Sequence, residues 1–417
     1  IKRRTSSQNT IALQYLRETF SLDSRSLGLF RIGLGIVICY DLLALLPDID
    51  AFFGPDGVYP AYISRWSFDC LVKRLWFRYV LFIINALLAV LLILGYYTRP
   101  VTILCWLMAV SLAHRNPLVM FLARDYALIL FLMWGMFLPL GQNFSLDSLR
   151  KKTGPLITKT FSMGSVGFIC SLMMIYLLSG WFKIHPSWNQ DLSALNYVFN
   201  NKDFVTTAGV WLLQFPSLLK VLTWLTVFIE RFGILLLLVP FNRNCIRYLL
   251  IIVFCVFHLS LWATTIVDWF ALIMIIAWLA LIPFKSAAVD INKNKWINGL
   301  AGAVLIFMMV CTYKNAEEFF LHTPKSPIFK AARIVGLDFP WRLFSPSPPL
   351  VRRHYYFNPP FDLNKKNYRW IFLLNNQTDA LMPFLKNYLI RDWNKTNPYQ
   401  SPITDAIIYS TEEKILP

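Results

Sequence analysis

Residues 76–95 read Trp-Phe-Arg-Tyr-Val-Leu-Phe-Ile-Ile-Asn-Ala-Leu-Leu-Ala-Val-Leu-Leu-Ile-Leu-Gly, a run with one charged side chain. A helix needs about 20 mostly apolar residues to cross the hydrocarbon core of a bilayer, so this run is long enough. Searching outward for similar windows gives nine candidate spans, at 26–46, 76–95, 100–114, 118–140, 164–183, 218–239, 246–263, 266–283 and 296–313. We therefore expect an all-α polytopic membrane bundle of about nine transmembrane helices. Eight or ten helices, or a re-entrant pair in place of the third and fourth, are the alternatives.

The composition of the 417 residues points the same way. Hydrophobic residues make up 57% of the chain and charged residues 15%, whereas soluble domains average roughly 45–50% and about 25%. This excludes a soluble globule, and the high aromatic content excludes a disordered chain. The net charge of +17 does not indicate a nucleic-acid partner, because the basic residues lie between apolar runs and not on one soluble face. The expected partner is the lipid bilayer.

Lys and Arg are distributed unevenly between alternate connections of the predicted helices. With the N-terminus inside, the inner segments hold fifteen of them and the outer loops hold five. Short loops rich in Lys and Arg resist translocation, so the richer side is cytoplasmic. We expect the segment 1–25 to be cytoplasmic and the C-terminus to lie on the outer side of the membrane, which is the plasma or inner membrane in a bacterial host. The first apolar run is too long for a signal-peptide core and is expected to remain as the first helix.

Three domains follow from this pattern: the cytoplasmic segment 1–25, a transmembrane domain over 26–313, and a soluble outer domain over 314–417. In the last of these, prolines cluster and alternating stretches such as 368–374 predict strands, so we expect a small β-containing domain. The loops 47–74 and 184–217 are predicted on the same side. A peptide or protein partner would bind there.

Ionisable residues inside the predicted spans are candidates for function, because each costs about 2.5–3.5 kcal/mol on insertion scales. The candidates are Arg31, Asp41, Arg124, Asp125, Lys183, Glu230, Arg231 and His258. The predicted helix directions place five of them in the outer half of the bilayer: Asp41, Arg124, Asp125, Lys183 and His258. Histidines outside the spans lack the spacing of a metal site, so no metal is predicted.

Lys183 and His258 are the predicted catalytic residues, and each has a simpler alternative. Burial disfavours an ammonium group, so a lysine in an apolar pocket can serve as a general base near neutral pH. That chemistry suits a weak acid delivered through the lipid, such as a hydroquinone. Alternatively, Lys183 extends its ammonium to the membrane surface and His258 is an ordinary hydrogen-bonding group between helices.

Asp41, Arg124, Asp125 and Glu230 form the predicted supporting polar cluster. Their alternative role is structural, because Arg124 beside Asp125, and Glu230 beside Arg231, can form ion pairs that hold the bundle together.

Residues 175–183, Ile-Tyr-Leu-Leu-Ser-Gly-Trp-Phe-Lys, followed by Trp188, resemble the helix of vitamin K-dependent gamma-glutamyl carboxylases that carries the catalytic lysine. The resemblance covers about residues 20 to 315. It includes the wider superfamily of the horizontally transferred transmembrane (HTTM) domain. Its further matches are Arg31, Asp56-Gly57, Phe137-Leu138-Pro139-Leu140-Gly141 with Ser145-Leu146-Asp147, Glu230, His258, and the tail phrase Trp341-x-x-Phe344-x-Pro346.

The resemblance implies carboxylase chemistry, in which a lysine deprotonates vitamin K hydroquinone and the oxygenated product removes a glutamyl proton so that carbon dioxide can add. Lys183 would be the base, His258 a helper, and a reduced quinone the cofactor. The chain departs from the carboxylases in three ways. Pro117 stands where they carry a functional His after Asn116, Phe182 replaces a second lysine, and the tail is much shorter.

Three functions therefore remain open. The first is an enzyme that uses a quinol to modify a peptide or lipid at the outer leaflet. The second is a non-catalytic maturation or assembly factor for an outer-side partner, and the third is a structural subunit of a membrane complex.

Overall fold

The computed structural model describes most of the chain from Ala12 to Lys414. The described residues are 12–49, 53, 66–72, 74–116, 120, 122–150, 158–202, 204–284, 289–338, 341–348, 351–357 and 407–414. The predicted Asp56-Gly57 turn, Pro117 and the predicted strand at 368–374 lie outside them. The described part is predominantly helical, as expected.

Six helices are long and apolar enough to cross a membrane. They are α2 (Ser24–Leu45), α4 (Leu75–Leu94), α8 (Met163–Trp181), α12 (Pro216–Arg231) with its 3-10 continuation η4 (Gly233–Leu238), α13 (Arg243–Thr264) and α15 (Lys295–Leu321). All six coincide with predicted spans, which supports a membrane protein.

The other three predicted spans fall on helices that miss this criterion. These are α5 (Thr98–Arg115), α6 (Ala123–Phe137) and α14 (Phe270–Leu279). The helix α6 is buried on every side and lies in the centre of the bundle, where neighbouring protein replaces lipid. A helix in that position does not need the length or uniform apolarity of a lipid-facing one. The count of nine crossings stays a prediction.

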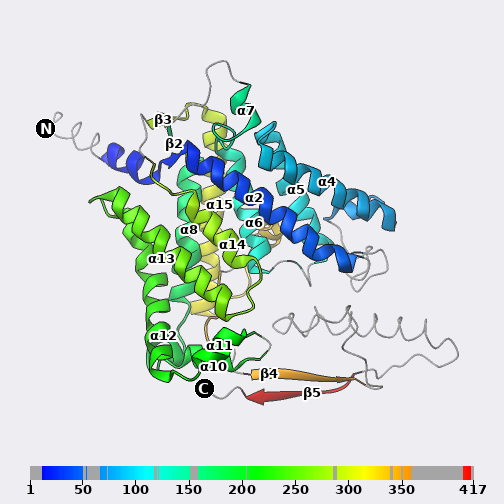
Figure 1. Ribbon diagram of the computed structural model, residues 1–417, viewed down its shortest axis with the longest axis vertical. Coiled ribbons are helices and arrows are strands. Elements are labelled where there is room, and N and C mark those ends of the chain that lie inside the picture. Colours follow the sequence, from blue (N-terminus) through cyan, green and yellow to red (C-terminus); the bar gives the residue numbers. More distant parts are fainter. Residues whose placement is uncertain are drawn as a thin grey trace.

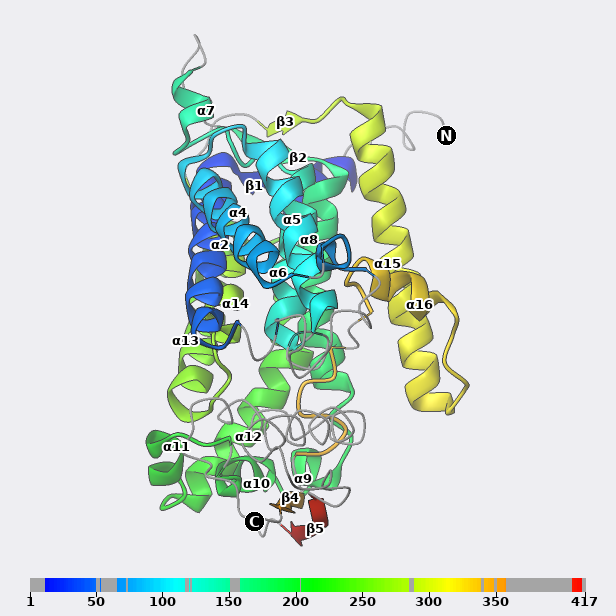
Figure 2. The same ribbon diagram turned by 90° about the vertical axis from the view of Figure 1, so that its right-hand side faces the viewer.

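Three short strands pair at one end of the bundle, which we call the sheet end (Figure 2). The strand β2 (Lys159–Phe161) lies between β1 (Leu22–Asp23), to which it is antiparallel, and β3 (Val289–Ile291), to which it is parallel. All three belong to segments predicted on the cytoplasmic side. Their pairing therefore agrees with the predicted alternation of the helices, because an even number of predicted spans separates each strand from the next.

The opposite end, which we call the loop end, holds the short helices α9 (Pro186–Asn189), α10 (Ala194–Asn200) and α11 (Thr207–Leu212). A β-bridge joins Val205 to Thr265, so the connection between α13 and α14 lies at this end too. Both segments belong to predicted outer connections. The minor elements are η1 (Leu46–Asp48), η3 (Phe68–Cys70), α7 (Leu146–Leu149) and α16 (Ile328–Ile334).

The lipid-facing character of the outer helices is visible in their burial. Only 17% of the apolar window of α15 and 28% of that of α13 are buried inside the protein, against 67% for α8. Apolar side chains that remain exposed over whole helix faces indicate contact with lipid and not with water.

Arg31 of α2 links neighbouring segments at the sheet end by hydrogen bonds. Its guanidinium is fully buried and donates hydrogen bonds to the carbonyl oxygens of Leu140 at 3.2 Å and Ile93 at 2.6 Å, and also to those of Leu92 and Phe144. Leu92 and Ile93 lie in the last turn of α4, where carbonyls have spare acceptor capacity and carry partial negative charge. The Leu92 carbonyl also accepts from the Gly95 backbone nitrogen at 3.1 Å. Arg31 thus joins α2 to the end of α4 and to the turn that follows α6.

In the tail, β4 (Val351–Phe357) and β5 (Ile407–Lys414) form a two-stranded antiparallel ribbon (Figure 1). This agrees with a β-containing tail, whereas an independent domain over 314–417 remains a prediction. The segment 341–348 runs back to the loop end and contacts α9.

Candidate functional site

Lys183 follows the last turn of α8 at the loop end. Tyr176, Ser179 and Lys183 are spaced three and four residues apart, so they share one face of the helix. Only 1% of Lys183 is exposed. The alternative in which its ammonium extends to the membrane surface is therefore wrong, because the side chain turns into the protein.

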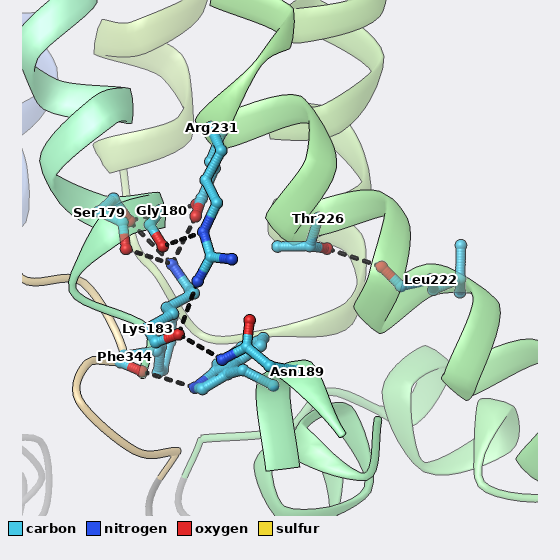
Figure 3. Close-up of polar contacts among 10 residues, drawn as sticks. Ser179, Gly180, Lys183, Asn189, Leu222, Thr226, Arg231 and Phe344 are labelled. Carbon is cyan, nitrogen blue, oxygen red and sulfur yellow. Dashed lines mark hydrogen bonds and ion pairs between the residues drawn. The ribbon is translucent and has the colours of Figure 1, made fainter. Parts of the chain in front are cut away.

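The ammonium nitrogen of Lys183 has a hydrogen-bond acceptor for each of its three hydrogens (Figure 3). It lies 2.6 Å from Glu230 Oε2, 2.8 Å from Ser179 Oγ and 3.3 Å from the Ser179 carbonyl oxygen. Ser179 Oγ in turn donates to Glu230 Oε1 at 3.2 Å. The face of the Trp188 ring lies 5.2 Å from the same nitrogen, which adds a cation–π contact. Lys183 and Glu230, two predicted site residues from separate helices, thus form one buried ion pair.

Arg231 holds the backbone around this pair. Its Nε donates to the Gly180 carbonyl at 2.8 Å and its Nη2 to the Lys183 carbonyl at 2.8 Å. The Gly180 carbonyl also accepts from the Lys183 backbone nitrogen at 3.4 Å, and the Lys183 carbonyl accepts from Asn189 Nδ2 at 2.7 Å. Among the described residues no ion pair joins Arg231 to Glu230, so the predicted pairing of these neighbours is wrong. Adjacent helical residues point in different directions, and each reaches a different group near the end of α8.

Gly180 allows α8 and α12 to approach each other. A Cβ atom at this position would lie 2.9 Å from Arg231 Cγ and 2.9 Å from Glu230 Cβ. Only glycine fits without displacing the two residues that bind Lys183 and its turn. Gly180 is therefore a close-packing position between the two helices.

The tail segment 341–348 covers this end of the site. Trp188 Nε1 donates to the Phe344 carbonyl at 3.1 Å, and the His185 backbone nitrogen donates to the Pro346 carbonyl at 3.1 Å. The Arg342 guanidinium lies 5.1 Å from the ring centre of Phe182. The tail phrase noted in the sequence is therefore a structural contact with the segment just after Lys183.

His258, on α13, belongs to a second polar group. This group contacts α8 at Tyr176, about two helical turns from Lys183. His258 Nε2 lies 2.7 Å from Tyr176 Oη, and Trp278 Nε1 donates to the same oxygen at 2.8 Å. The tryptophan can only donate, so Tyr176 has its own hydrogen available for His258 Nε2; when Tyr176 donates, the histidine hydrogen is on Nδ1. That nitrogen is buried and has no hydrogen-bond partner among the described residues.

Lys183 and His258 are thus linked through α8 and not through direct contact. Tyr176, the partner of His258, precedes Lys183 by seven residues, about 10 Å along the helix axis. Among the described residues no hydrogen bond joins Lys183 to His258. The joint action of Lys183 and His258 in one site stays a prediction.

The remaining predicted site residues form a third group between α2, α6 and α14. Arg124 forms an ion pair with Asp268, and its Nε lies 3.6 Å from Asp125 Oδ1. Asp41 accepts a hydrogen bond from Trp269 Nε1 at 3.0 Å. The Arg124 guanidinium lies over the Trp269 ring at 5.6 Å. The predicted neighbours Arg124 and Asp125 do pair, but Asp268 is the closer acidic partner.

Five residues that the sequence reasoning missed complete these groups: Tyr176, Ser179, Asp268, Trp269 and Trp278. Ser179 was detectable, because it precedes Lys183 by one helical turn and carries a hydroxyl. Asp268 was detectable as the acidic residue in the nearly absent connection after α13. Nothing in the local sequence marks Trp278 as the partner of Tyr176.

Comparison of the chain with known protein families, with curated proteins and with solved structures found no match. The chemistry of the site is therefore argued from its own groups. A lysine and a carboxylate joined by a 2.6 Å hydrogen bond can exist as ammonium and carboxylate or as amine and carboxylic acid. Water stabilises only the first form, so burial narrows the free-energy difference between the two. The pair can hold or release a proton inside the membrane domain.

Proposed function

We propose that this chain is an integral membrane enzyme of the vitamin K-dependent carboxylase-like type, in which the Lys183–Glu230 pair accepts a proton from a reduced quinone. The observation that carries the proposal is the burial of an exchangeable ion pair at the loop end, 1% exposed at the lysine and 6% at the glutamate. A buried ionisable pair inside a membrane domain is a default candidate for proton chemistry.

The charge balance of the proposed step suits a neutral acid. The pair carries no net charge, because the ammonium and the carboxylate cancel. When a hydroquinone transfers a proton to the pair, the pair becomes +1 and the quinol anion −1. The ammonium then stabilises the anion at short range, where low dielectric strengthens the attraction.

The second polar group supports the same substrate class. His258 Nδ1 is buried and has no hydrogen-bond partner among the described residues, and the imidazole ring packs against Phe257 and Phe270, at 5.3 and 5.9 Å between ring centres. A quinone has a flat ring that packs against aromatics and a carbonyl oxygen that accepts a hydrogen bond. The subsequent carboxylation of a peptide is what the family resemblance adds, and Pro117 and the short tail are its departures.

The topology proposed with this function has nine crossings, the N-terminus in the cytoplasm and the loop end on the outer side. It is supported by the three strands at the sheet end, which come from segments rich in Lys and Arg. The site then lies in the outer leaflet, within reach of a quinone from the lipid and of a peptide from the outer space.

The experiment measures oxygen uptake that depends on vitamin K hydroquinone, with the protein in nanodiscs. Lys183→Met keeps the apolar length of the side chain and removes the exchangeable proton, and we expect the rate to fall at least about 100-fold, the lower end for acid–base catalysis. Lys220→Met, an exposed lysine on α12, is the matched control and should keep the wild-type rate. Quinol turnover that survives Lys183→Met would exclude this mechanism.

The second candidate is a non-catalytic maturation or assembly factor. The observation that favours it is the complete hydrogen bonding of Lys183 Nζ, which is also what a purely structural ion pair requires. It predicts that the wild-type protein consumes no quinol but purifies with a stoichiometric partner bound on the loop end. Quinol turnover by the wild-type protein without any partner would exclude it.

A further inference from the structure

A cleft opens at the sheet end, at the opposite end of the bundle from Lys183. It has a volume of about 520 Å³ and lies between the start of α5 and the turn 138–142 that follows α6. The turn contains the Leu138-Pro139-Leu140-Gly141 motif, which the proposed function does not use. The arguments below are independent of that function.

The cleft is held open by fixed contacts. Asp147 accepts hydrogen bonds from the backbone nitrogens of Tyr97 at 2.9 Å and Thr98 at 2.7 Å, and from Thr98 Oγ1 at 2.7 Å. Gly141 lies so close to Thr98 that a Cβ atom would be 2.6 Å from Thr98 Oγ1. Arg31 binds the Leu140 carbonyl from below. The walls therefore do not depend on a ligand for their shape.

Two guanidinium groups line the cleft. Arg99 is exposed and makes no hydrogen bond or ion pair within the described part of the chain. Arg150 is also exposed, with its guanidinium 5.4 and 5.5 Å from the ring centres of Tyr96 and Tyr97. The single carboxylate in the lining, Asp147, is already engaged at the start of α5. Asp147 also attracts Arg150 electrostatically, but its oxygens are taken by three hydrogen bonds at the start of α5, so both Arg forks keep donors for a phosphate group.

Gln142 adds a hydrogen-bond acceptor that needs a donor. It lines the cleft, and its Oε1 is buried without a hydrogen-bond partner in the described part. Oε1 is covered in this conformation, so the side chain must rotate toward the cleft before a hydroxyl donor on the ligand can satisfy it. The ligand should therefore carry both a phosphate and a free hydroxyl.

The position of the cleft favours a lipid as its ligand. It lies where α4 and α6 end and α5 begins, and Tyr97 in its wall is 55% exposed. Tyrosine and arginine at the ends of membrane helices are typical of the headgroup level of a bilayer. We propose that the cleft binds the headgroup of an anionic phospholipid, with its phosphodiester on Arg99 and Arg150 and a headgroup hydroxyl on Gln142.

The test measures lipid bound to the protein by native mass spectrometry after exchange into nanodiscs that contain phosphatidylcholine and a few per cent phosphatidylglycerol. We expect R99Q/R150Q to weaken retention of phosphatidylglycerol about 25-fold, because each Arg near an anionic surface contributes a factor of about five. The control K293Q/K295Q removes the same charge from two exposed lysines at the sheet end, outside the cleft, and should retain the lipid. An equal loss of phosphatidylglycerol retention in both variants would overturn the proposal, because it would show general electrostatic attraction of the lipid and not a specific site.

A second variant tests the hydroxyl. Gln142→Leu should reduce the preference for phosphatidylglycerol over phosphatidic acid, which has the phosphate but no headgroup hydroxyl, and an unchanged preference would contradict the assignment. Glycerol 1-phosphate identifies the source of the ligand. If this soluble headgroup alone displaces the lipid at equal concentration, the site recognises a soluble phosphate and the lipid proposal is wrong. The melting temperature of each variant in detergent should equal that of the wild type, and a variant that melts lower is replaced by the single changes R99Q and R150Q, which should each weaken retention about fivefold.

Discussion

Arg31 at the sheet end and Lys183 at the loop end are both fully buried cations inside a membrane protein, but their partners differ. Arg31 is surrounded by four backbone carbonyl oxygens, whereas Lys183 is paired with the carboxylate of Glu230. A guanidinium does not deprotonate in a protein and carbonyls do not accept a proton from it, so the first arrangement is permanent. An ammonium and a carboxylate can exchange a proton. Two cations buried to the same degree thus form a permanent link in one place and a pair that can exchange a proton in the other.

The largest effect is expected from removal of the Arg31 guanidinium. Arg31→Met removes the donor of four carbonyls, and of these Leu92 keeps the Gly95 backbone nitrogen at 3.1 Å. At about 1–3 kcal/mol for each of the other three unsatisfied groups, the loss is about 3–9 kcal/mol. We expect no folded protein, measured as loss of the monodisperse peak in detergent. Arg31→Lys keeps the charge with three donors and should restore part of the yield. A normal yield of Arg31→Met would show that these carbonyls do not need the guanidinium.

The next prediction sharpens the difference at Lys183. Lys183→Met leaves Glu230 buried without its partner and should destabilise the protein by about 3 kcal/mol, as for other broken buried pairs. The double variant Lys183→Met/Glu230→Leu removes both charges and should recover most of the stability but none of the proposed activity. Thermal unfolding in one detergent measures the first quantity and quinol-dependent oxygen uptake the second. If activity returned together with stability, the pair would be structural.

A smaller effect is expected from Gly180→Ala, which tests how tightly the active pair is held. The added Cβ would lie 2.9 Å from atoms of Arg231 and Glu230, and overpacking of this kind costs about 1–3 kcal/mol. The rate of quinol-dependent oxygen uptake should be affected more strongly than the free energy of unfolding, because Glu230 shifts relative to Lys183. Gly302→Ala on α15 is the control, since its nearest neighbour would be 3.8 Å away. An unchanged rate in Gly180→Ala would show that the geometry of the pair is not critical.

The smallest effect concerns Asp147 at the sheet end. Partial burial raises the pKa of this carboxyl, but hydrogen bonds from Thr98 and Tyr97 outweigh burial and hold the pKa below its ordinary value. Its stabilising contribution is therefore present above the unfolded pKa of about 3.9 and is lost as the pH falls through the lower folded pKa.

Asp147→Asn should consequently lower the stability at pH 7 by about 1 kcal/mol, the usual value for a lost helix cap. The difference from the wild type should shrink as the pH falls below 4. Melting temperatures of both proteins between pH 3 and 7 measure this, and a constant difference would show that the charge of Asp147 is unimportant.

The sequence predicted the elements of this fold better than their contacts. All six long apolar helices lie where the hydropathy pattern predicted them, because a lipid-facing helix must be apolar along its whole length. The pattern is less informative for α6, since a central helix contacts protein on every side. Its Arg124 and Asp125 are satisfied by neighbours and not by lipid.

The candidate site shows the same limit. Lys183 and His258 could be selected from the sequence because ionisable groups are costly inside a span. Glu230 was selected by the same rule, but its contact with Lys183 could not be predicted, because tertiary packing brings α12 to α8. The contact of His258 with Tyr176 depends on packing in the same way. The wrong pairing of Glu230 with Arg231 came from sequence adjacency, which on a helix separates two side chains.

The three-stranded sheet also sets an order on biosynthesis. Its strands lie at residues 22–23, 159–161 and 289–291, so the last partner leaves the ribosome only after most of the membrane segments have been made. Until then β2 has a free edge beside β1, and the early helices cannot reach their final arrangement at this end. A chain that stops before residue 289 should insert but remain open there, exposed to the proteases that survey newly inserted membrane proteins.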